Sequence, residues 1–339
     1  MQKLINDPYA VVDEMLDGFL RAHADKVRRV EGANRAIVRM NAPQQGKVGV
    51  LIGGGSGHKP AFIGYLGRGG ADGVAVGNVF ASPPPDPVMA AARAIDGGAG
   101  VLFSYGNYSG DVMNFDMAAE TLAEEGIDVR TVLVTDDVAS APKGDEENRR
   151  GIAGDFFIFK IAGARSEEMA TLDEVEAAAR NANANCRTMG VALSACIVPA
   201  AGKATFSLDD GEMEIGLGVH GEPGMRRGKL ESADAVTATL VETILADMPL
   251  ERGAEVAVLV NGLGATPYSE LYVIFRHVAA MLDERGIVMH RTYVGEYVTS
   301  LEMAGASVTL MKLDAELKRL IDAPADCAMF AQFGATSAG

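Results

Sequence analysis

The chain has 339 residues, 40 of them glycine, no tryptophan and a formal net charge of −16 at pH 7. This acidic balance argues against nucleic acid or an anionic membrane as a partner. The sequence shows no signal-peptide core, no apolar run of membrane-spanning length and no metal or redox pattern among its three cysteines, so we expect a cytoplasmic protein of two domains.

The first half of the sequence alternates predicted strands and helices. A helix capped by Asp7-Pro8 is expected first, with apolar residues from Val11 to Leu20 at helical spacing. Apolar runs then predict strands at 36–38, 48–52, 73–76, 100–103 and 129–134, and helices are predicted at 88–95, 113–122, 152–164 and 172–184. This alternation indicates an α/β sheet with a parallel core, in which polar loops follow the strands.

A domain boundary is predicted near Asn185. Residues 1–184 would form an amino-terminal α/β domain, and residues 185–339 a carboxyl-terminal α/β domain that carries His220. In the second domain we expect strands at 191–198, 212–219, 255–260, 288–294 and 307–310, and helices at 233–245, at 269–284 and before Pro324. The predicted fold class is therefore two α/β domains with mixed, largely parallel sheets, followed by a disordered tail after Phe330.

The most unusual stretch is Gly-Gly-Gly-Ser-Gly-His-Lys-Pro, residues 53–60, between an apolar strand and a segment that can begin a helix. This order is typical of a ligand site at the carboxyl end of a parallel strand. It is not a P-loop, because Lys59 precedes Pro60 instead of serine or threonine, and it lacks the glycine spacing of a dinucleotide fingerprint. A tight structural turn with a solvated histidine is the alternative.

Three side chains could carry chemistry, because each lies in a glycine-containing loop after a predicted strand. They are His58, Asp111 and His220, which could together supply a nucleophile, an acid and a base. Each also has a structural explanation, since the histidines could be turn residues and Asp111 a helix N-cap. Zinc binding, as in a zinc hydrolase, fits less well because no fourth ligand is present.

Taken together, the motifs resemble those of the dihydroxyacetone kinase family, and more narrowly its substrate-binding K subunit. The resemblance rests on Gly-Gly-Gly-Ser-Gly-His at 53–58, Asn-Tyr-Ser-Gly-Asp at 107–111 and Gly-Val-His-Gly-Glu-Pro-Gly at 218–224, with further segments at 77–84, 261–267 and 300–309. It extends from about Leu4 to Phe330. The resemblance implies a homodimer of two-domain α/β subunits.

The resemblance also implies roles for particular residues. The histidine that matches His220 bonds covalently to the ketone carbon, and His58 and Asp111 match the acid and base that act on the substrate hydroxyl. Gly55 and Ser82 match positions that contact substrate. Imidazole adds to a carbonyl but not to an alcohol carbon, so a ketose would be held with its terminal hydroxyl ready for phosphorylation, and glycerol would be rejected.

In this family the nucleotide sits on a separate L subunit, so we expect no cofactor and no metal on this chain. The partner would hold ATP, or ADP recharged by a phosphotransferase-system protein, together with magnesium. The implied activity is that of a phosphotransferase with an alcohol acceptor, present only in the complex. Two alternatives stay open: a ketose-binding regulatory protein without turnover, and a kinase subunit for a larger ketose such as erythrulose.

Two positions depart from the family pattern. Lys59 stands where the family often has glutamate, and Gly106 stands where it often has a substrate-contacting lysine. The missing side chain at Gly106 is expected to leave room beside Asp111 for a longer ketose, unless water or a neighbouring side chain fills the gap.

Overall fold

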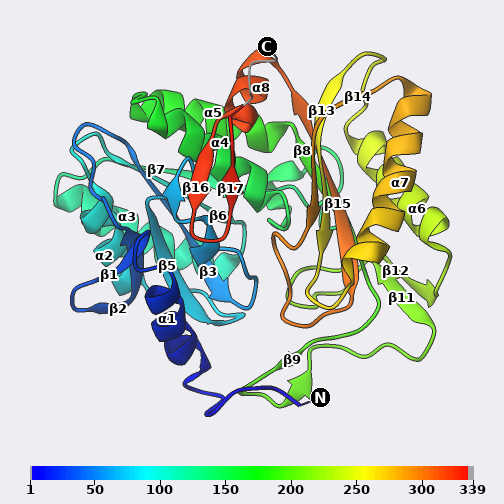
Figure 1. Ribbon diagram of the computed structural model, residues 1–339, viewed down its shortest axis with the longest axis horizontal. Coiled ribbons are helices and arrows are strands. Elements are labelled where there is room, and N and C mark those ends of the chain that lie inside the picture. The colour runs from blue at the N-terminus through cyan, green and yellow to red at the C-terminus, as the bar shows by residue number, and fades with distance from the viewer. Residues whose placement is uncertain (1, 335–339) are drawn as a thin grey trace.

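Two six-stranded β-sheets carry the fold, with helices between them and on their outer faces (Figure 1). The computed structural model describes residues 2–334. Within that range no helix is both long and apolar enough to cross a membrane. The prediction of an α/β fold with two mixed sheets is confirmed.

The first sheet has the strand order β1-β2-β5-β3-β6-β7. Strands β5, β3, β6 and β7 are mutually parallel. At one edge of the sheet β2 pairs antiparallel with β5, and β1 pairs antiparallel with β2. The bounds are Val27–Val30 for β1, Ala33–Arg39 for β2, Gly49–Ser56 for β3, Gly73–Val79 for β5, Val101–Gly106 for β6 and Val129–Val134 for β7. The sequence analysis did not find β1, because its Val-Arg-Arg-Val sequence is not an apolar run.

The second sheet has the order β12-β11-β8-β15-β13-β14, and within it only β13 and β14 are parallel. Strand β8 begins at Cys186 instead of Val191, and β11 ends at Ile215 and pairs with β12 as a hairpin. The bounds are Cys186–Ala192 for β8, Glu212–Ile215 for β11, Arg226–Lys229 for β12, Glu255–Gly262 for β13, Val288–Gly295 for β14 and Gly305–Leu313 for β15. A separate two-stranded ribbon consists of β9 (Ile197–Val198) and β10 (Lys203–Ala204).

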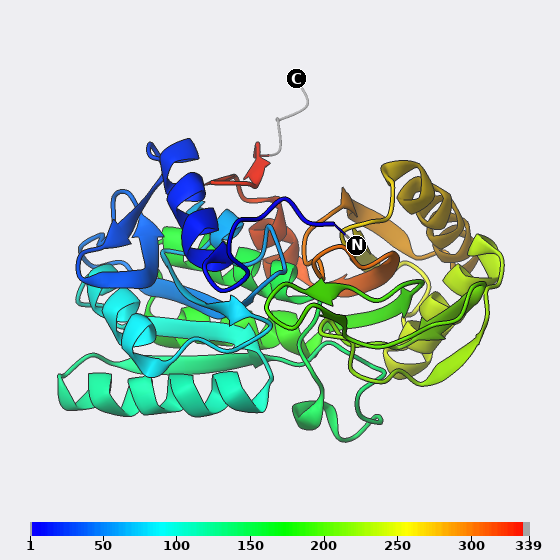
Figure 2. The same cartoon turned by 90° about the horizontal axis from the view of Figure 1, so that it is seen from below.

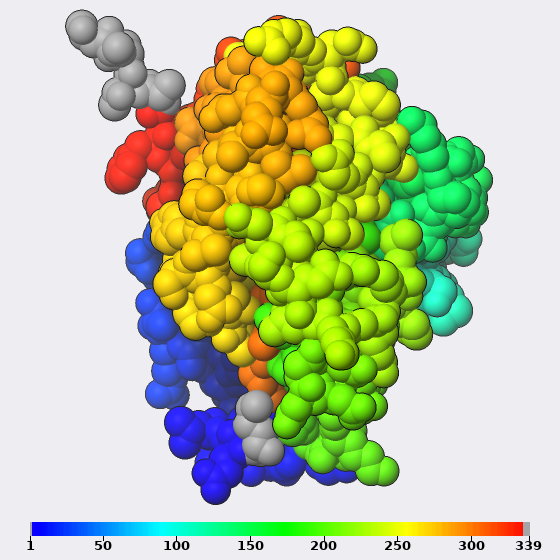
Figure 3. Space-filling view, turned by 90° about the vertical axis from the view of Figure 1, so that its right-hand side faces the viewer, coloured from blue at the N-terminus to red at the C-terminus, as the bar shows by residue number. Residues whose placement is uncertain are grey.

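Helices cover the sheets in layers (Figures 1 and 2). Helices α2 and α3 pack on one face of the first sheet, and α6 and α7 form the outer face of the second half (Figure 3). Helix α4 lies between the two sheets, with α5 and α8 packed beside it. The bounds are Val11–Ala22 for α1, Pro85–Ile95 for α2, Ser109–Glu124 for α3, Asp155–Glu167 for α4, Leu172–Ala184 for α5, Ala233–Asp247 for α6, Tyr268–Arg285 for α7 and Ala315–Asp322 for α8.

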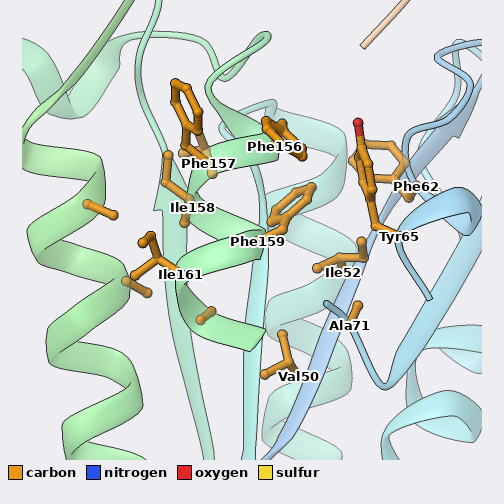
Figure 4. Close-up of a cluster of buried hydrophobic side chains, with 14 of the residues drawn as sticks. Val50, Ile52, Phe62, Tyr65, Ala71, Phe156, Phe157, Ile158, Phe159 and Ile161 are labelled. Atoms are coloured by element: carbon orange, nitrogen blue, oxygen red, sulfur yellow. The ribbon is translucent and has the colours of Figure 1, made fainter. Parts of the chain in front are cut away.

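Helix α4 is buried on all sides because both sheets pack against it. Its segment Phe156–Ile161 is apolar around the whole circumference except for Lys160, whose Nζ donates to Leu320 O at 3.0 Å. Phe156 and Phe159 pack against the rings of Tyr65 and Phe62 (Figure 4). On β13, successive side chains belong to two different clusters, one shared with α4 and one with α6 and α7.

The core therefore continues across the predicted boundary at Asn185, which coincides with the end of α5. The division into residues 1–184 and 185–339 stays a prediction.

Two local helix predictions are wrong. Asp7 does not cap α1, which begins at Val11; its Oδ1 instead accepts from the Tyr9 amide at 2.9 Å. The helix expected after Pro60 is a single 3₁₀ turn at Ile63–Tyr65. It ends because the chain continues as β4 (Gly67–Arg68), which pairs with β16 (Ala325–Cys327) so closely that a Cβ on Gly67 would lie 2.3 Å from Asp326 O.

The tail is also more ordered than predicted. Residues Ala331–Gln332 form β17, which pairs with β16. The buried side chain of Gln332 donates from Nε2 to Ile321 O at 2.7 Å. The part of the predicted disordered tail beyond Gly334 lies outside the described residues.

Candidate active site

A small cleft lies at the carboxyl ends of β3 and β6, where residues of both halves meet. Its volume is about 330 Å³, counting space open to solvent. A larger groove of about 730 Å³ lies against α6 and α7, but its walls are mainly apolar and include none of the predicted site residues. We therefore take the smaller cleft as the candidate site, since it is lined by five of the six predicted residues: Gly55, His58, Gly106, Asp111 and His220.

The first three glycines of the motif belong to β3 itself, where they allow close packing. A Cβ on Gly53 would lie 2.6 Å from Ala75 O, and one on Gly55 would lie 2.8 Å from Ala81 N. Gly54 has φ 151°, and a side chain there would meet the ring of Phe62 at 2.7 Å. Larger residues at these positions would separate β3 from its neighbours and displace the following His58.

His58 and His220 face each other across the cleft, with their Nε2 atoms 3.2 Å apart. His58 Nδ1 lies 2.7 Å from Thr299 O and donates to it, because a carbonyl oxygen can only accept. His220 Nδ1 lies 2.8 Å from Glu222 Oε1. Burial alone would raise the pKa of Glu222, but the hydrogen bond and charge of His220 outweigh it and hold this pKa at about 2, so the carboxylate accepts.

The contact between the two Nε2 atoms requires one further proton, because both Nδ1 protons are already used. Burial and the charge of His220 lower the pKa of His58 to about 3, so His58 Nε2 is the acceptor in this contact and His220 Nε2 the donor. Phe80 stacks on His58 with ring centroids 5.1 Å apart and holds its plane. His58 Nε2 is thus placed to take a proton from His220 and free its lone pair.

Asp111 supplies a buried carboxylate in the first turn of α3, where it is 7% exposed. Its Oδ1 has no hydrogen-bond partner. Burial raises the pKa of Asp111 to about 6, while the nearby Ser82 hydroxyl and the charge of His220 oppose the rise. The alternative role as helix N-cap is not found, because Tyr108 holds the N-cap position. Ser82 itself lies beside Gly110, where a Cβ would be 2.8 Å from its Oγ.

Four residues that the sequence analysis did not single out complete the site. Thr299 and Glu222 orient the two histidines, and Tyr108 and Asp155 line the cleft. Glu222 lies two residues after His220, within a motif already quoted, so its carboxylate could have been proposed as the partner. Asp155 stands at the head of an otherwise apolar segment, which was the available indication of a special role.

The two departures from the family pattern have different outcomes. Lys59 is only partly buried and is not among the residues that line the cleft, and burial lowers its pKa to about 8. Gly106 lines the cleft, and a Cβ there would lie 3.2 Å from both Gly151 O and Tyr108 Cε2. The Tyr108 ring thus lies next to Gly106, and room in the cleft for a longer ketose stays a prediction.

Within residues 2–334, no cluster of three or more histidine, cysteine or acidic side chains could hold a metal ion. The three cysteines are all buried and free.

The fold and the cleft define an α/β protein whose cleft is lined by paired imidazole and carboxyl groups. Residues 17–329 match the Dak1 domain, and the chain belongs to this family, as its motifs predicted.

Three known proteins show how far the similarity extends. The chain is 47% identical over 330 residues to the dihydroxyacetone-binding subunit DhaK of PTS-dependent dihydroxyacetone kinase 2 from Listeria innocua, covering 97% of this chain and 99% of that subunit. It is 49% identical over 326 residues to D-erythrulose kinase from Mycolicibacterium smegmatis, covering 96% of this chain but 56% of that kinase. The dihydroxyacetone kinase from C. freundii in complex with AMP-PNP and Mg²⁺ superimposes with a TM-score of 0.88 at 32% identity, covering 98% of this chain and 61% of the other.

Proposed function

We propose that this chain is the substrate-binding subunit of a phosphotransferase that acts on short ketoses such as dihydroxyacetone. The facing pair of His58 and His220 beside the buried Asp111 carries the proposal. The match along nearly the whole length of a dihydroxyacetone-binding subunit supports it.

The histidine pair can form a covalent adduct with a ketone. His58 Nε2 takes the Nε2 proton of His220, and the freed lone pair adds to the carbonyl carbon. A nitrogen–carbon bond forms, the carbonyl π bond breaks, and His58 returns the proton to the new alkoxide, giving a hemiaminal. Throughout, Glu222 keeps its bond to Nδ1 and balances the positive charge on the imidazole of His220.

Phosphoryl transfer then needs a base at the terminal hydroxyl. We assign this role to Asp111, which is ionised above pH 6 because its pKa is about 6. Gly55 in the cleft wall and Ser82 beside Asp111 are proposed to contact the substrate.

The phosphate donor is proposed to come from a separate nucleotide-binding L subunit. A solved relative is in complex with AMP-PNP and Mg²⁺, which supports nucleotide and magnesium use by this kind of kinase. PTS dependence in the name of the Listeria relative makes a phosphotransferase-system protein a further candidate partner. We also propose that the chain forms a homodimer.

The decisive experiment reconstitutes the reaction. The purified chain, dihydroxyacetone, ATP and magnesium are incubated with and without an L subunit from the same organism, and the sugar phosphate is quantified. We expect product only with the partner, and a His220→Ala variant should lose the ketose adduct seen by mass spectrometry while it keeps its melting temperature. Turnover by the chain alone would contradict the proposal, and binding without turnover in the complex would favour the regulatory alternative.

A further inference from the structure

The cleft contains two buried polar groups that the proposed chemistry does not use. Asp155 is 3% exposed, and its Oδ1 has no hydrogen-bond partner. The hydroxyl of Tyr108 is also buried without a partner. Buried polar groups in native proteins are almost always hydrogen-bonded, so two unpartnered groups in one cleft are available to a bound ligand.

The backbone of Asp155 is held in place by its neighbours in the chain. It is the first residue of α4, and the next residues, Phe156 and Phe157 (Figure 4), pack against Tyr293 in the core. Its carboxylate is not needed to hold this turn, because the buried Asp136 already does so. Asp136 accepts from the Ile152 amide at 2.8 Å and from the Gly154 amide at 2.7 Å.

Tyr108 is fixed close to the position of the proposed adduct. Its ring meets the ring of His220 edge to face, with centroids 4.9 Å apart, and its other side lies against Gly106. Gly106 and Gly151, which have no side chains, line the same cleft as Tyr108 and Asp155.

We propose that Asp155 and Tyr108 form a subsite for the additional hydroxyl of a ketose with at least four carbons. The proposal rests on the proposed function and refines its substrate class. The unpartnered atoms of the cleft, Asp111 Oδ1, Asp155 Oδ1 and the Tyr108 hydroxyl, provide one partner for each hydroxyl of a four-carbon ketose. Dihydroxyacetone has one hydroxyl fewer and leaves one of these groups unsatisfied.

The pKa shifts of Asp155 and Asp111 fit the different roles proposed for these two carboxyl groups. Burial, together with the charges of Asp136 and Asp111, raises the pKa of Asp155 well above its ordinary value. This shift favours the protonated carboxyl of Asp155, the form that can donate to a sugar hydroxyl, whereas Asp111 is the carboxyl group left to act as base.

The test measures ketose binding to the isolated chain by titration calorimetry, which needs no partner subunit. We compare dihydroxyacetone with erythrulose, and the quantity of interest is the ratio of their dissociation constants. Wild type should bind erythrulose at least as tightly as dihydroxyacetone. Asp155→Leu should shift the ratio about tenfold towards dihydroxyacetone, and Tyr108→Phe severalfold, because each removes one hydrogen bond that only the longer ketose completes. Asp155→Asn keeps a donor and an acceptor and should largely keep the ratio.

Asp72→Asn is the matched control, because this equally buried carboxylate accepts from Lys47 Nζ and from the Val50 amide and does not line the cleft. It should lower the melting temperature and leave the ratio unchanged. Asp155→Leu should instead melt no lower than wild type, since it removes an unpartnered buried carboxyl. If Asp155→Leu fails to fold, Tyr108→Phe decides, because it removes a single oxygen.

Ratios that stay at the wild-type value in the folded Asp155 and Tyr108 variants would overturn the subsite and leave the proposed function intact. A wild-type preference for dihydroxyacetone of tenfold or more would overturn the subsite as well. Failure of the wild type to bind either ketose would instead overturn the proposed function.

Discussion

Glu222 is the most informative residue to change, because its two oxygens fix His220 from two directions. Oε1 accepts from His220 Nδ1 at 2.8 Å, and Oε2 accepts from the His220 amide at 2.9 Å. In Glu222→Gln one of these oxygens becomes an amide nitrogen, so a donor would face a donor and one contact is lost. The variant also removes the negative charge that balances the imidazolium.

The size of the effect follows from the electrostatics of the pair. A pKa of about 2 instead of 4.5 corresponds to roughly 3 kcal/mol in favour of the carboxylate. The side chain is 29% exposed, so solvent screening makes this an upper limit. Hydrogen bonds to charged groups contribute about 1.5–3 kcal/mol, and we expect Glu222→Gln to bind ketose about 10–100-fold more weakly.

Calorimetric titration with dihydroxyacetone measures this change, and a melting curve tests the fold. Glu214→Gln is the matched control, because its carboxylate anchors the same loop through the Gly224 amide at 2.7 Å without touching His220. Equal losses in both variants would show that only loop stability matters, and unchanged binding in Glu222→Gln would refute the role assigned to the charge of Glu222. Because the pKa of Glu222 is lowered, its stabilising effect should be present above pH 4.5 and disappear as the pH falls towards 2.

Three further predictions concern the cleft. Because the pKa of Asp111 is about 6, the rate of phosphorylation by the complex should fall about tenfold per pH unit below pH 6. Asp111→Asn should bind ketose without transferring phosphate. A rate that stays constant down to pH 5 would contradict the role of Asp111 as the base. Because the pKa of Asp111 is raised, ionisation of its buried carboxyl group destabilises the fold as the pH rises from 3.8 to 6. Asp111→Asn should therefore have a higher melting temperature than wild type at pH 8, and the difference should be smaller at pH 4. Gly106→Lys should push the Tyr108 ring aside, because its Cβ would lie 3.2 Å from that ring, and should reduce kcat/KM for erythrulose more than for dihydroxyacetone. Equal values in Gly106→Lys and wild type would show that the ring position does not matter.

Elements defined by local interactions were predicted well from the sequence. Strand β7 at Val129–Val134 and helix α5 at Leu172–Ala184 have the predicted bounds. The start of α5 is fixed by a capping box in which Thr171 and Glu174 bond reciprocally, an interaction that depends only on near neighbours in the chain.

Elements whose form depends on pairing between strands were not predicted. Strand β1 is polar in sequence and forms because β2 offers it a pairing edge. The 3₁₀ turn at Ile63–Tyr65 stays short because β4 pairs with β16, far along the chain. The register of such pairs is decided by packing, to which local propensity contributes little.

The sequence by itself determined which side chains are candidates for a chemical role. His58, Asp111 and His220 each follow a strand among glycines, a pattern set by chain order and local composition. Tertiary structure decided what these side chains can do. The packing of both sheets around α4 brings together His58 and His220, 162 residues apart, and supplies Thr299 and Glu222 as their partners. It also buries Asp111 and Asp155, and because removal from water sets the charge of a carboxyl group, their separate roles exist only in the folded protein.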